Sequence, residues 1–453
     1  MSPIASSISK FLEGIKLTSF DDFEALITKC ASPGIRPGLE RIERLLSILG
    51  NPQNNYPAVH VVGTNGKGST CAFLASVFQT AGYKTALYTS PHLESPAERL
   101  AIDGRFLEPE RWMICAEKAV SAVVEDDMLR GDPPSYFELI TAAAFLLAAE
   151  EDVDVAVIEA GMGGRLDATN LLSKVVCTAV ASISMDHAEF LGSTVQAIAG
   201  EKFAVVRNGA PACYLGDNES LLSIFERFCC DAGAIPFIVS RDAKIDSVSV
   251  TADGCEFDYS TPGFEMKRVK TRLLGRYQVS NATLALSVLS LLTEKFDRLT
   301  EDAIRAGLFN ARWPGRLEVM SRSGEKPVLV LDGGHNPDGV AKLAESAAEL
   351  WGGKKIGVVY AAMKDKDYPA CIRSINKLAP EFYATTVPDV ARALSVPEIT
   401  AVASEMQWRG GVKPFENPLA AIAEASKNND VVLVCGSLYF IGWLRSRVAR
   451  VNA

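Results

Sequence analysis

The chain has 453 residues, a formal net charge of −9 at pH 7, 48% hydrophobic residues and 22% charged residues. This length exceeds what one hydrophobic core usually organises, so we expect two domains of an ordinary globular protein. The acidic balance argues against nucleic acid or an anionic membrane as a partner, although a small basic pocket for anionic substrates is compatible with it.

Targeting signals are not evident in the sequence. Residues 1–16 lack the basic start and apolar core of a signal peptide, and no run approaches the ~18 apolar residues that span a bilayer. The ten cysteines include no C-x-x-C pair, and several stand in apolar runs, which indicates buried, reduced thiols. We therefore expect a cytoplasmic protein.

Apolar, β-branched runs alternate with helical patterns along the chain. The predicted strands are residues 58–62, 85–89, 153–158, 175–183, 328–331, 355–360 and 431–435. The predicted helices are residues 68–81, 137–150, 279–293, 301–308, 339–350 and 417–427. Continuous apolar strands separated by helices are typical of parallel sheets that are covered on both faces. The sequence predicts an α/β fold with two doubly wound units.

Two further segments bear on the domain organisation. Residues 245–272 alternate apolar and polar side chains, which predicts a small antiparallel excursion within the first domain. Pro314-Gly315 follows the helical pattern at 301–308 and breaks any helix, so we place a hinge near residue 311. The predicted domains are residues 1–311 and residues 312–453.

A glycine-rich loop follows the first predicted strand and leads into a helix. Its candidate nucleotide-binding residues are Gly63, Thr64, Asn65, Gly66, Lys67, Gly68 and Ser69. Glycines let the backbone wrap a phosphate, helix N–H groups favour negative charge, and Lys67 supplies a cation for the β- and γ-phosphates. A plain strand-to-helix turn is the alternative, and the spacing departs from the common G-x-x-x-x-G-K-[ST] form.

The short form Gly-Thr-Asn-Gly-Lys-Gly-Ser resembles the ATP loop of the Mur ligase superfamily, and more narrowly that of folylpolyglutamate synthases and dihydrofolate synthases. Similar segments continue in order over roughly residues 36–440; they include residues 89–93, 98–104, 135–138, 159–170, 186–187, 201–202, 313–318 and 332–337. The resemblance implies a P-loop-type doubly wound ATPase domain followed by a smaller, Rossmann-like ligase domain. It also implies a reaction in which ATP phosphorylates a folate-type carboxylate and L-glutamate attacks the acyl phosphate.

The resemblance implies that Ser90, Glu159 and His187 hold Mg²⁺. Glu159 and His187 follow predicted strands, and ligands collect at the carboxyl ends of parallel strands. From the residues alone, a histidine is an unusual Mg²⁺ ligand and is more often a hydrogen-bonded side chain. Lys202 would be read as a solvated helix lysine, whereas the resemblance implies a carbamate, which turns the cation into an anionic ligand. Lys67, His187 and Lys202 are thus the candidate catalytic residues.

Substrate positions are also implied by the resemblance. The acceptor side comprises Ser135, Tyr136, Phe137, Glu138, Leu166, Asp167 and Ala168, together with Lys202. Ser135 and Glu138 have, in addition, the spacing of a helix capping box. Asn281, Arg316 and Asp332 match family positions that bind ATP, although Asp332 before two glycines is equally a turn-forming residue. His335 is a plausible neighbour of the acyl phosphate and receives no role.

Three segments depart from the family pattern, and two rival functions remain open. Ser95-Pro96-Ala97 replaces Ser-Phe-Asn, Gly334 stands where Ala is usual, and Asp338 stands where His is common. One rival is a cell-wall Mur ligase that acts on a nucleotide sugar, and the other is a non-catalytic ATP-binding switch. We expect a monomer that uses Mg²⁺, ATP, L-glutamate and folate or dihydropteroate, with no nucleic-acid or membrane partner.

Overall fold

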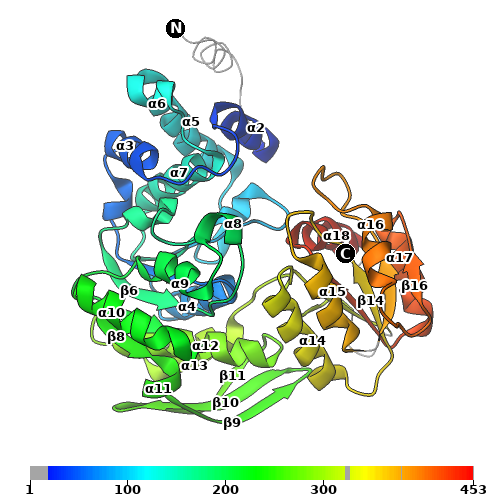
Figure 1. The fold of residues 1–453 in the computed structure, drawn as a ribbon. Helices are drawn as coiled ribbons and strands as arrows, with labels where there is room; N and C mark the ends of the chain where they lie inside the picture. Colours follow the sequence, from blue (N-terminus) through cyan, green and yellow to red (C-terminus); the bar gives the residue numbers. More distant parts are fainter. Residues whose placement is uncertain (1–18, 322–326, 379, 452–453) are drawn as a thin grey trace. The chain divides into compact units, whose positions relative to one another are not determined.

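The computed structural model describes residues 19–321, 327–378 and 380–451. The chain forms two compact units (Figure 1). Unit 1 comprises Met1–Ile245, Tyr259–Met266 and Asn281–Ala311, and unit 2 comprises Asp246–Asp258, Lys267–Ser280 and Arg312–Ala453. Residues 1–16, to which the expectation about a signal peptide applies, lie outside the described residues.

Unit 1 is built on an eight-stranded sheet. Its strands are β1 (Ala58–Val62), β2 (Thr85–Tyr88), β3 (Leu100–Ile102), β4 (Arg105–Phe106), β5 (Val155–Glu159), β6 (Val175–Val180), β7 (Pro211–Tyr214) and β8 (Ile235–Ile238). Their order is β4-β3-β2-β5-β1-β6-β7-β8, and all pairs are parallel except β2–β3 and β3–β4. The carboxyl ends of β2, β5, β1 and β6 therefore share one edge.

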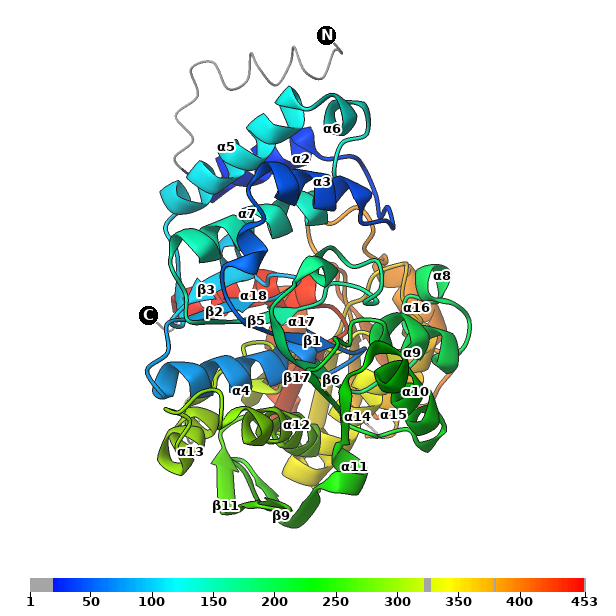
Figure 2. The same cartoon turned by 90° about the vertical axis from the view of Figure 1, so that its left-hand side faces the viewer.

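Helices cover both faces of this sheet (Figure 2). One core joins the sheet to α2 (Phe20–Cys30), α3 (Glu40–Ile48), α5 (Pro109–Glu125), α6 (Asp127–Gly131) and α7 (Tyr136–Glu150). The opposite side carries α4 (Lys67–Thr80) and α13 (Glu301–Asn310), with the part of α12 (Arg276–Leu292) that belongs to unit 1. Beside β6–β8 lie α8 (Ala188–Leu191), α9 (Val195–Phe203), α10 (Leu222–Ala232) and α11 (Val239–Asp242).

A three-stranded sheet occupies the region of alternating polarity. Its strands are β9 (Lys244–Thr251), β10 (Gly254–Thr261) and β11 (Phe264–Thr271), in the order β11-β10-β9. Turns of two residues join them, and connections that short require antiparallel neighbours. The predicted antiparallel excursion is therefore present, and its residues are divided between the two units.

Unit 2 contains a second, six-stranded sheet. Its strands are β12 (Glu318–Val319), β13 (Val328–Asp332), β14 (Ile356–Tyr360), β15 (Glu381–Ala384), β16 (Val412–Pro414) and β17 (Val431–Cys435), in the order β12-β13-β17-β14-β15-β16. Only β12 runs antiparallel to its neighbour. One face packs against α14 (Pro337–Trp351), α15 (Tyr368–Asn376) and α16 (Val396–Ala403), and the other packs against α17 (Pro418–Asn428) and α18 (Leu438–Val451).

The predicted α/β fold with two doubly wound sheets is confirmed. The strands predicted at 58–62 and 431–435 have the observed bounds, whereas the one predicted at 175–183 ends at Val180. Nine of the ten cysteines, all of which are described, are buried; Cys230 is exposed, and none forms a disulfide. No helix in the described ranges is long and apolar enough to cross a membrane.

Candidate active site

The glycine-rich loop joins β1 to α4 and is tightly enclosed. Gly66, with φ +88°, precedes the first residue of α4, and no side chain caps that helix. A Cβ at Gly66 would lie 2.3 Å from the Asn281 side-chain oxygen, and one at Gly63 would lie 2.9 Å from the Ala181 Cβ. Glycine is therefore required at both positions, and the N–H groups of the first helical turn border the loop.

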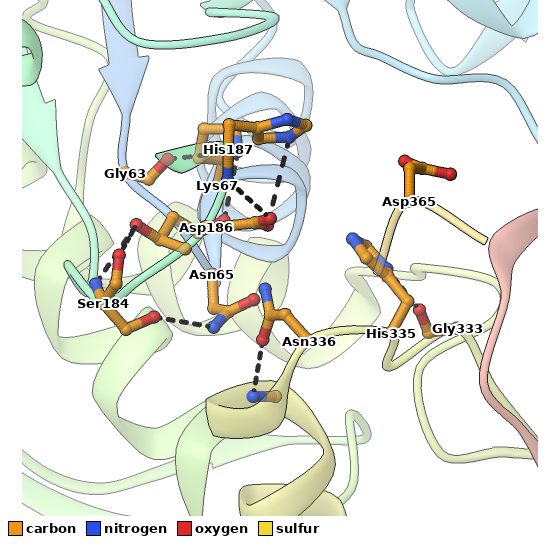
Figure 3. A network of polar contacts seen from close by, with 12 residues as sticks. Gly63, Asn65, Lys67, Ser184, Asp186, His187, Gly333, His335, Asn336 and Asp365 are labelled. Carbon is orange, nitrogen blue, oxygen red and sulfur yellow. Dashed lines mark hydrogen bonds and ion pairs between the residues drawn. The ribbon is translucent and has the colours of Figure 1, made fainter. Parts of the chain in front are cut away.

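Lys67 folds back over the loop that precedes it. Its Nζ donates to the carbonyl oxygens of Gly63 (3.1 Å; Figure 3) and Thr64 (3.2 Å). The same nitrogen lies 4.0 Å from Glu159 Oε1. Glu159 is the last residue of β5, is 5% exposed, and accepts through Oε2 from the Ser90 backbone N–H at 3.2 Å. Glu159, at the end of β5, thus lies between Lys67, the first residue of α4, and the backbone of Ser90, two residues after β2.

The loop after β6 is tied to the phosphate loop. Thr64 Oγ1 donates to the Ser184 carbonyl (3.0 Å) and accepts from the Ser184 N–H (3.1 Å), and Asn65 Nδ2 donates to Ser184 Oγ (3.4 Å) (Figure 3). His187 follows with φ +50°, and its Nε2 lies 3.9 Å from Asp186 Oδ2. These contacts hold the start of the 184–187 segment beside the phosphate loop. In the described part of the chain, no three His, Cys, Asp or Glu side chains are grouped so that they could hold a metal ion.

Lys202 is not the solvated lysine that its helical pattern indicated. It lies on α9, is only 4% exposed, and its Nζ donates to the Gly63 carbonyl at 2.9 Å. Burial, together with the charge of Lys67, lowers the pKa of Lys202 to about 7. A side chain 139 residues along the chain from Gly63 therefore reaches the phosphate loop with much of its amine unprotonated near neutral pH.

The Ser135–Glu138 segment forms the capping box at the start of α7. Ser135 Oγ accepts from the Glu138 N–H, and Glu138 Oε2 accepts from the Ser135 N–H (2.7 Å) and from Arg41 Nε (3.3 Å). Phe137 lies so close to Gly161 that a Cβ there would be 2.5 Å from the ring. Glu138 thus stabilises the helix start, while Phe137 borders the loop after β5 and Tyr136 donates to Glu24 (3.4 Å).

Asp167 organises the loop that contains Leu166 and Ala168. Its Oδ1 accepts from the Thr169 N–H (3.0 Å) and hydroxyl (2.6 Å), and its Oδ2 accepts from the Met162 N–H (2.8 Å). Burial raises the pKa of the Asp167 carboxyl. Leu166 is 46% exposed and Ala168 is buried, so Leu166 is the side chain of this trio that faces solvent.

In unit 2, Asp332 ends β13 and holds two turns. Its Oδ1 accepts from the Gly334 N–H (2.7 Å), and its Oδ2 accepts from the Leu317 N–H (2.9 Å) and the Tyr277 hydroxyl (3.4 Å). The turn-forming alternative for Asp332 is therefore present, and burial raises the pKa of its carboxyl. Arg316 lies across Gly333, where a Cβ would be 2.5 Å from Nη1.

His335 and Asn336 follow this turn. His335 Nδ1 donates to the Gly333 carbonyl at 2.9 Å, and Asn336 caps α14 by accepting from the Gly339 N–H at 2.8 Å (Figure 3). Asp338 lies in the first turn of α14 and pairs with Lys342 (3.1 Å), so this departure from the family pattern suits a helix start.

The departure at Ser95-Pro96-Ala97 is also accommodated. Ser95 caps the short helix η2 (Pro96–Arg99), and Pro96 occupies its first position, where no N–H partner is needed. Glu98 accepts from the N–H groups of Leu93 (2.7 Å), Glu94 (2.8 Å) and Ser95 (2.9 Å). The proline therefore removes no hydrogen bond from this loop.

Comparison with known proteins decides the family. The Mur ligase middle domain matches residues 61–289, and the Mur ligase glutamate ligase domain matches residues 315–438. The dihydrofolate synthase/folylpolyglutamate synthase of Bacillus subtilis is 34% identical over 95% of this chain and 99% of its own. The chain belongs to the dihydrofolate synthase/folylpolyglutamate synthase family. It is an ATP-dependent acid–amino-acid ligase with the Mur ligase architecture.

Solved structures agree with this assignment. A Mycobacterium tuberculosis folylpolyglutamate synthase complexed with ADP has 30% identity and a TM-score of 0.87, over 95% of this chain and 98% of that one. Escherichia coli FolC in complex with DHPP and ADP has 27% identity and a TM-score of 0.85, over 96% of this chain and 99% of that one. These names favour the folate branch over the cell-wall alternative.

Three polar side chains near these loops have no role that the sequence pattern indicates. Arg41 braces Glu138, Tyr277 contacts Asp332, and Arg99 lies beside the Ser90 segment. Arg99 does stand within the family-like segment 98–104, but no property of the sequence shows that its side chain is buried. Contacts between distant segments, which only the fold supplies, identify Arg41 and Tyr277.

Proposed function

We propose that the chain ligates L-glutamate to a folate-type carboxylate, with ATP as co-substrate and an acyl phosphate as the intermediate. The observation that carries the proposal is the meeting of Lys67, Glu159 and Ser90 at the carboxyl ends of three adjacent parallel strands. A cation and a buried carboxylate beside a glycine-rich helix start are the parts that phosphoryl transfer needs. The DHPP and ADP in the Escherichia coli FolC structure support an acceptor and a nucleotide of this kind.

The reaction follows from positioning and charge. A carboxylate oxygen of the acceptor attacks the γ-phosphorus, and the bond from that phosphorus to the β–γ bridging oxygen breaks to release ADP. The glutamate amine then attacks the acyl carbon, loses a proton, and expels phosphate. Lys67 and the N–H groups at the start of α4 neutralise the phosphate charge that moves during the first step.

Oxygen donors suitable for Mg²⁺ are present in unit 1. Ser90 and Glu159 are in contact, and His187 follows the loop that Thr64 holds, so we assign the metal to these three residues. When bound, Mg²⁺ would supply positive charge that the nucleotide phosphates require. The buried Glu159 carboxylate, whose Oε1 lies 4.0 Å from Lys67 Nζ, fits a cation ligand.

Lys202 is proposed to carry a carbamate. Its neutral amine attacks the carbon of CO₂, so a new N–C bond forms while one C–O π bond breaks and its electron pair moves to oxygen. The nitrogen then loses a proton to solvent, which gives an anion beside Gly63. The lowered pKa favours this reaction because the neutral amine is the nucleophile. Lys202→Ala should lose activity that short carboxylic acids partly restore, whereas density for an unmodified ammonium at a metal-loaded site would refute the carbamate.

We assign nucleotide contacts to the phosphate loop and Asn281 in unit 1 and to Arg316 and Asp332 in unit 2. Asn281 lies against Gly66, and Arg316 presents a guanidinium suited to phosphate. Functionally, we divide the chain into an ATP-binding domain at 1–311 and a ligase domain at 312–453. We place the reaction in the cytoplasm and expect a monomer.

We propose that the enzyme accepts dihydropteroate as well as reduced folates, because both acceptors carry a terminal carboxylate on the same pterin–aminobenzoate frame. The exposed Leu166 and the ring of Phe137, which borders Gly161, are the candidate contacts of that frame. Saturating dihydropteroate, ATP and glutamate should yield dihydrofolate, and tetrahydrofolate should be extended. Extension of tetrahydrofolate without any dihydrofolate formation would restrict the enzyme to polyglutamylation.

The proposed ligase is tested by phosphate release. Purified protein should release phosphate from ATP only when a folate-type acid and L-glutamate are both present. Equal release without an acceptor would indicate a hydrolytic switch, and dependence on a nucleotide sugar would indicate the cell-wall branch.

A further inference from the structure

Arg99 is a buried arginine at the same edge of the unit 1 sheet as the candidate site, but it has no part in the reaction described above. It is 7% exposed and ends η2 immediately before β3. The Thr89 N–H donates to its carbonyl at 3.1 Å, and the next residue, Leu100, pairs with Tyr88. Arg99 therefore lies beside Thr89, and Thr89 immediately precedes the candidate metal ligand Ser90.

The guanidinium of Arg99 has little to balance its charge. Its Nε donates to His92 Nδ1 at 3.2 Å, and no other side-chain hydrogen bond or ion pair of Arg99 occurs within the described residues. Neither amino nitrogen is among the fully enclosed polar atoms that lack a partner, so both retain access to solvent. Because arginine stays protonated, burial of this charge without a carboxylate is costly.

Arg41 shows how this chain satisfies a structural arginine. It is 6% exposed, much like Arg99, yet its Nε pairs with Glu138 Oε2 at 3.3 Å and its Nη2 donates to the Arg36 carbonyl at 2.7 Å. The acid nearest to Arg99 in sequence, Glu98, instead accepts three backbone N–H groups of its own loop. Arg99 is thus held through Nε, and its two amino groups form a fork that the protein leaves unfilled.

A carboxylate is the ligand that matches such a fork, because it accepts two parallel hydrogen bonds in one plane. The strand order β3-β2-β5-β1 separates Arg99 from the phosphate loop by three strand spacings, or roughly 14 Å between backbones. The carboxylate that is phosphorylated lies at the phosphate loop, so the one that Arg99 receives is another group. In a folate-type acceptor, the remaining carboxylates are the α-carboxylates of the glutamyl tail.

We propose that Arg99 binds an α-carboxylate of the acceptor's glutamyl tail and thereby favours acceptors that already carry glutamate over dihydropteroate, which carries none. His92, which accepts the hydrogen bond from Arg99 Nε, acts as a positioning residue. This inference rests on the proposed glutamate-ligase function and assigns the discrimination between its two acceptors to one side chain.

The test compares Arg99→Met with Arg99→Lys and with the control Arg105→Met, which changes an exposed arginine on β4. KM and kcat are measured for tetrahydrofolate, dihydropteroate, L-glutamate and ATP. For Arg99→Met we expect the KM for tetrahydrofolate to rise roughly 10- to 100-fold, as for a lost pair of charge-assisted hydrogen bonds. The kcat and the other three KM values should stay within about twofold, and Arg99→Lys should be intermediate.

Equilibrium binding keeps this inference separable from the ligase proposal. Folate and pteroate, which differ by the glutamate, are titrated calorimetrically into each variant in the presence of ADP. Weaker folate binding with unchanged pteroate binding supports the inference, even if turnover of dihydropteroate is absent. Equal losses for both ligands, or a rise only in the KM for L-glutamate, would overturn it; if Arg99→Met does not fold, the same ratio for Arg99→Lys decides.

Discussion

At the residue scale, carboxylates that accept hydrogen bonds from backbone N–H groups shape the site. Asp167 holds the loop after β5, Asp332 holds two turns in unit 2, and Glu98 holds the segment before η2. Asp167 and Asp332 match family positions that bind substrate or ATP, yet their oxygens accept hydrogen bonds within the protein. Such residues position their neighbours, so their removal should disturb loop geometry as well as any direct contact with substrate.

The first prediction concerns the cation of the phosphate loop. Lys67→Ala should reduce ATP-dependent ligation at least about 100-fold, because the transferred phosphate loses its nearest positive charge. The thermal midpoint of unfolding should hardly change, because the Lys67 amine contacts only two loop carbonyls and, at 4.0 Å, Glu159 Oε1 in the described structure. Phosphate release and thermal melting are measured beside Lys174→Ala, an exposed control; near-wild-type turnover in Lys67→Ala would contradict the loop assignment.

The second prediction concerns the pH dependence of stability. The pKa of Lys202 falls from an ordinary 10.5 to about 7 on folding, so the folded chain binds fewer protons than the unfolded chain between these values. Stability contributed by Lys202 therefore rises with pH across that window and is constant below it. In CO₂-free buffer without metal, urea unfolding should show wild type gaining about 2–3 kcal/mol relative to Lys202→Met from about pH 7 to pH 9. A difference that does not vary with pH would show that the Lys202 pKa is ordinary.

At this scale, the sequence predicts features formed by neighbouring residues, and it does not predict contacts between residues far apart in the chain. The phosphate loop is recognisable because strand, glycines, lysine and helix are contiguous. Glu159 could be placed at the end of a strand, although it is the last strand residue and not the one after it. The contact of Lys202 with Gly63 joins segments 139 residues apart in the chain, and no local pattern encodes it.

At the scale of elements, α13 packs closely against α4, the helix that follows the phosphate loop. A Cβ at Gly307 of α13 would lie 2.4 Å from the Val77 Cα of α4, and Ser76 Oγ donates to the Gly307 carbonyl at 2.7 Å. Contact this near between helix backbones is possible only where one side chain is absent. The start of α4, and with it Lys67, is thereby backed by a rigid helix pair.

The third prediction tests this packing with a matched pair of glycine substitutions. Gly307→Ala should destabilise the protein by about 2 kcal/mol or more, because overlap with backbone atoms outweighs the gain of about 1 kcal/mol in helix propensity. Gly131→Ala, at the end of α6 with open space around it, should be neutral or slightly stabilising. Urea unfolding measures both; equal effects would argue against the close packing of α4 on α13.

The central strands were the most predictable elements. The central strands are continuous apolar runs, and their positions follow from the sequence. The strands β7 and β8 escaped prediction because they are short, contain Pro211 and Pro236, and in β8 are partly exposed at the sheet edge. The predicted first domain, residues 1–311, also includes residues 246–258 and 267–280. Their contacts group these residues with unit 2.

At the scale of the whole molecule, the proposed chemistry draws on both units. Unit 1 holds the phosphate loop, the metal candidates, Lys202 and Arg99. Unit 2 holds Arg316 and Asp332, which the resemblance assigns to ATP. Nucleotide binding by residues of unit 2 can therefore be tested separately from the chemistry of unit 1.

The fourth prediction addresses that claim. Arg316→Gln should raise the KM for ATP roughly 10- to 100-fold, because one charge-assisted grip on phosphate is lost. The KM for the acceptor should change little, and Arg373→Gln, on the α15 helix of the same unit, serves as the control. Steady-state kinetics give both values; an unchanged KM for ATP would remove Arg316 from the nucleotide site.

The proposed reaction passes through an acyl phosphate formed from the acceptor, and heavy-oxygen transfer tests this step most directly. The acceptor is prepared with heavy oxygen in the carboxylate to be activated, and the phosphate released during ligation is analysed by mass spectrometry. Attack of that carboxylate on ATP predicts one heavy oxygen in each phosphate, because the acyl–oxygen bond breaks when glutamate attacks. Phosphate that carries no heavy oxygen while glutamate is ligated would contradict the acyl-phosphate mechanism.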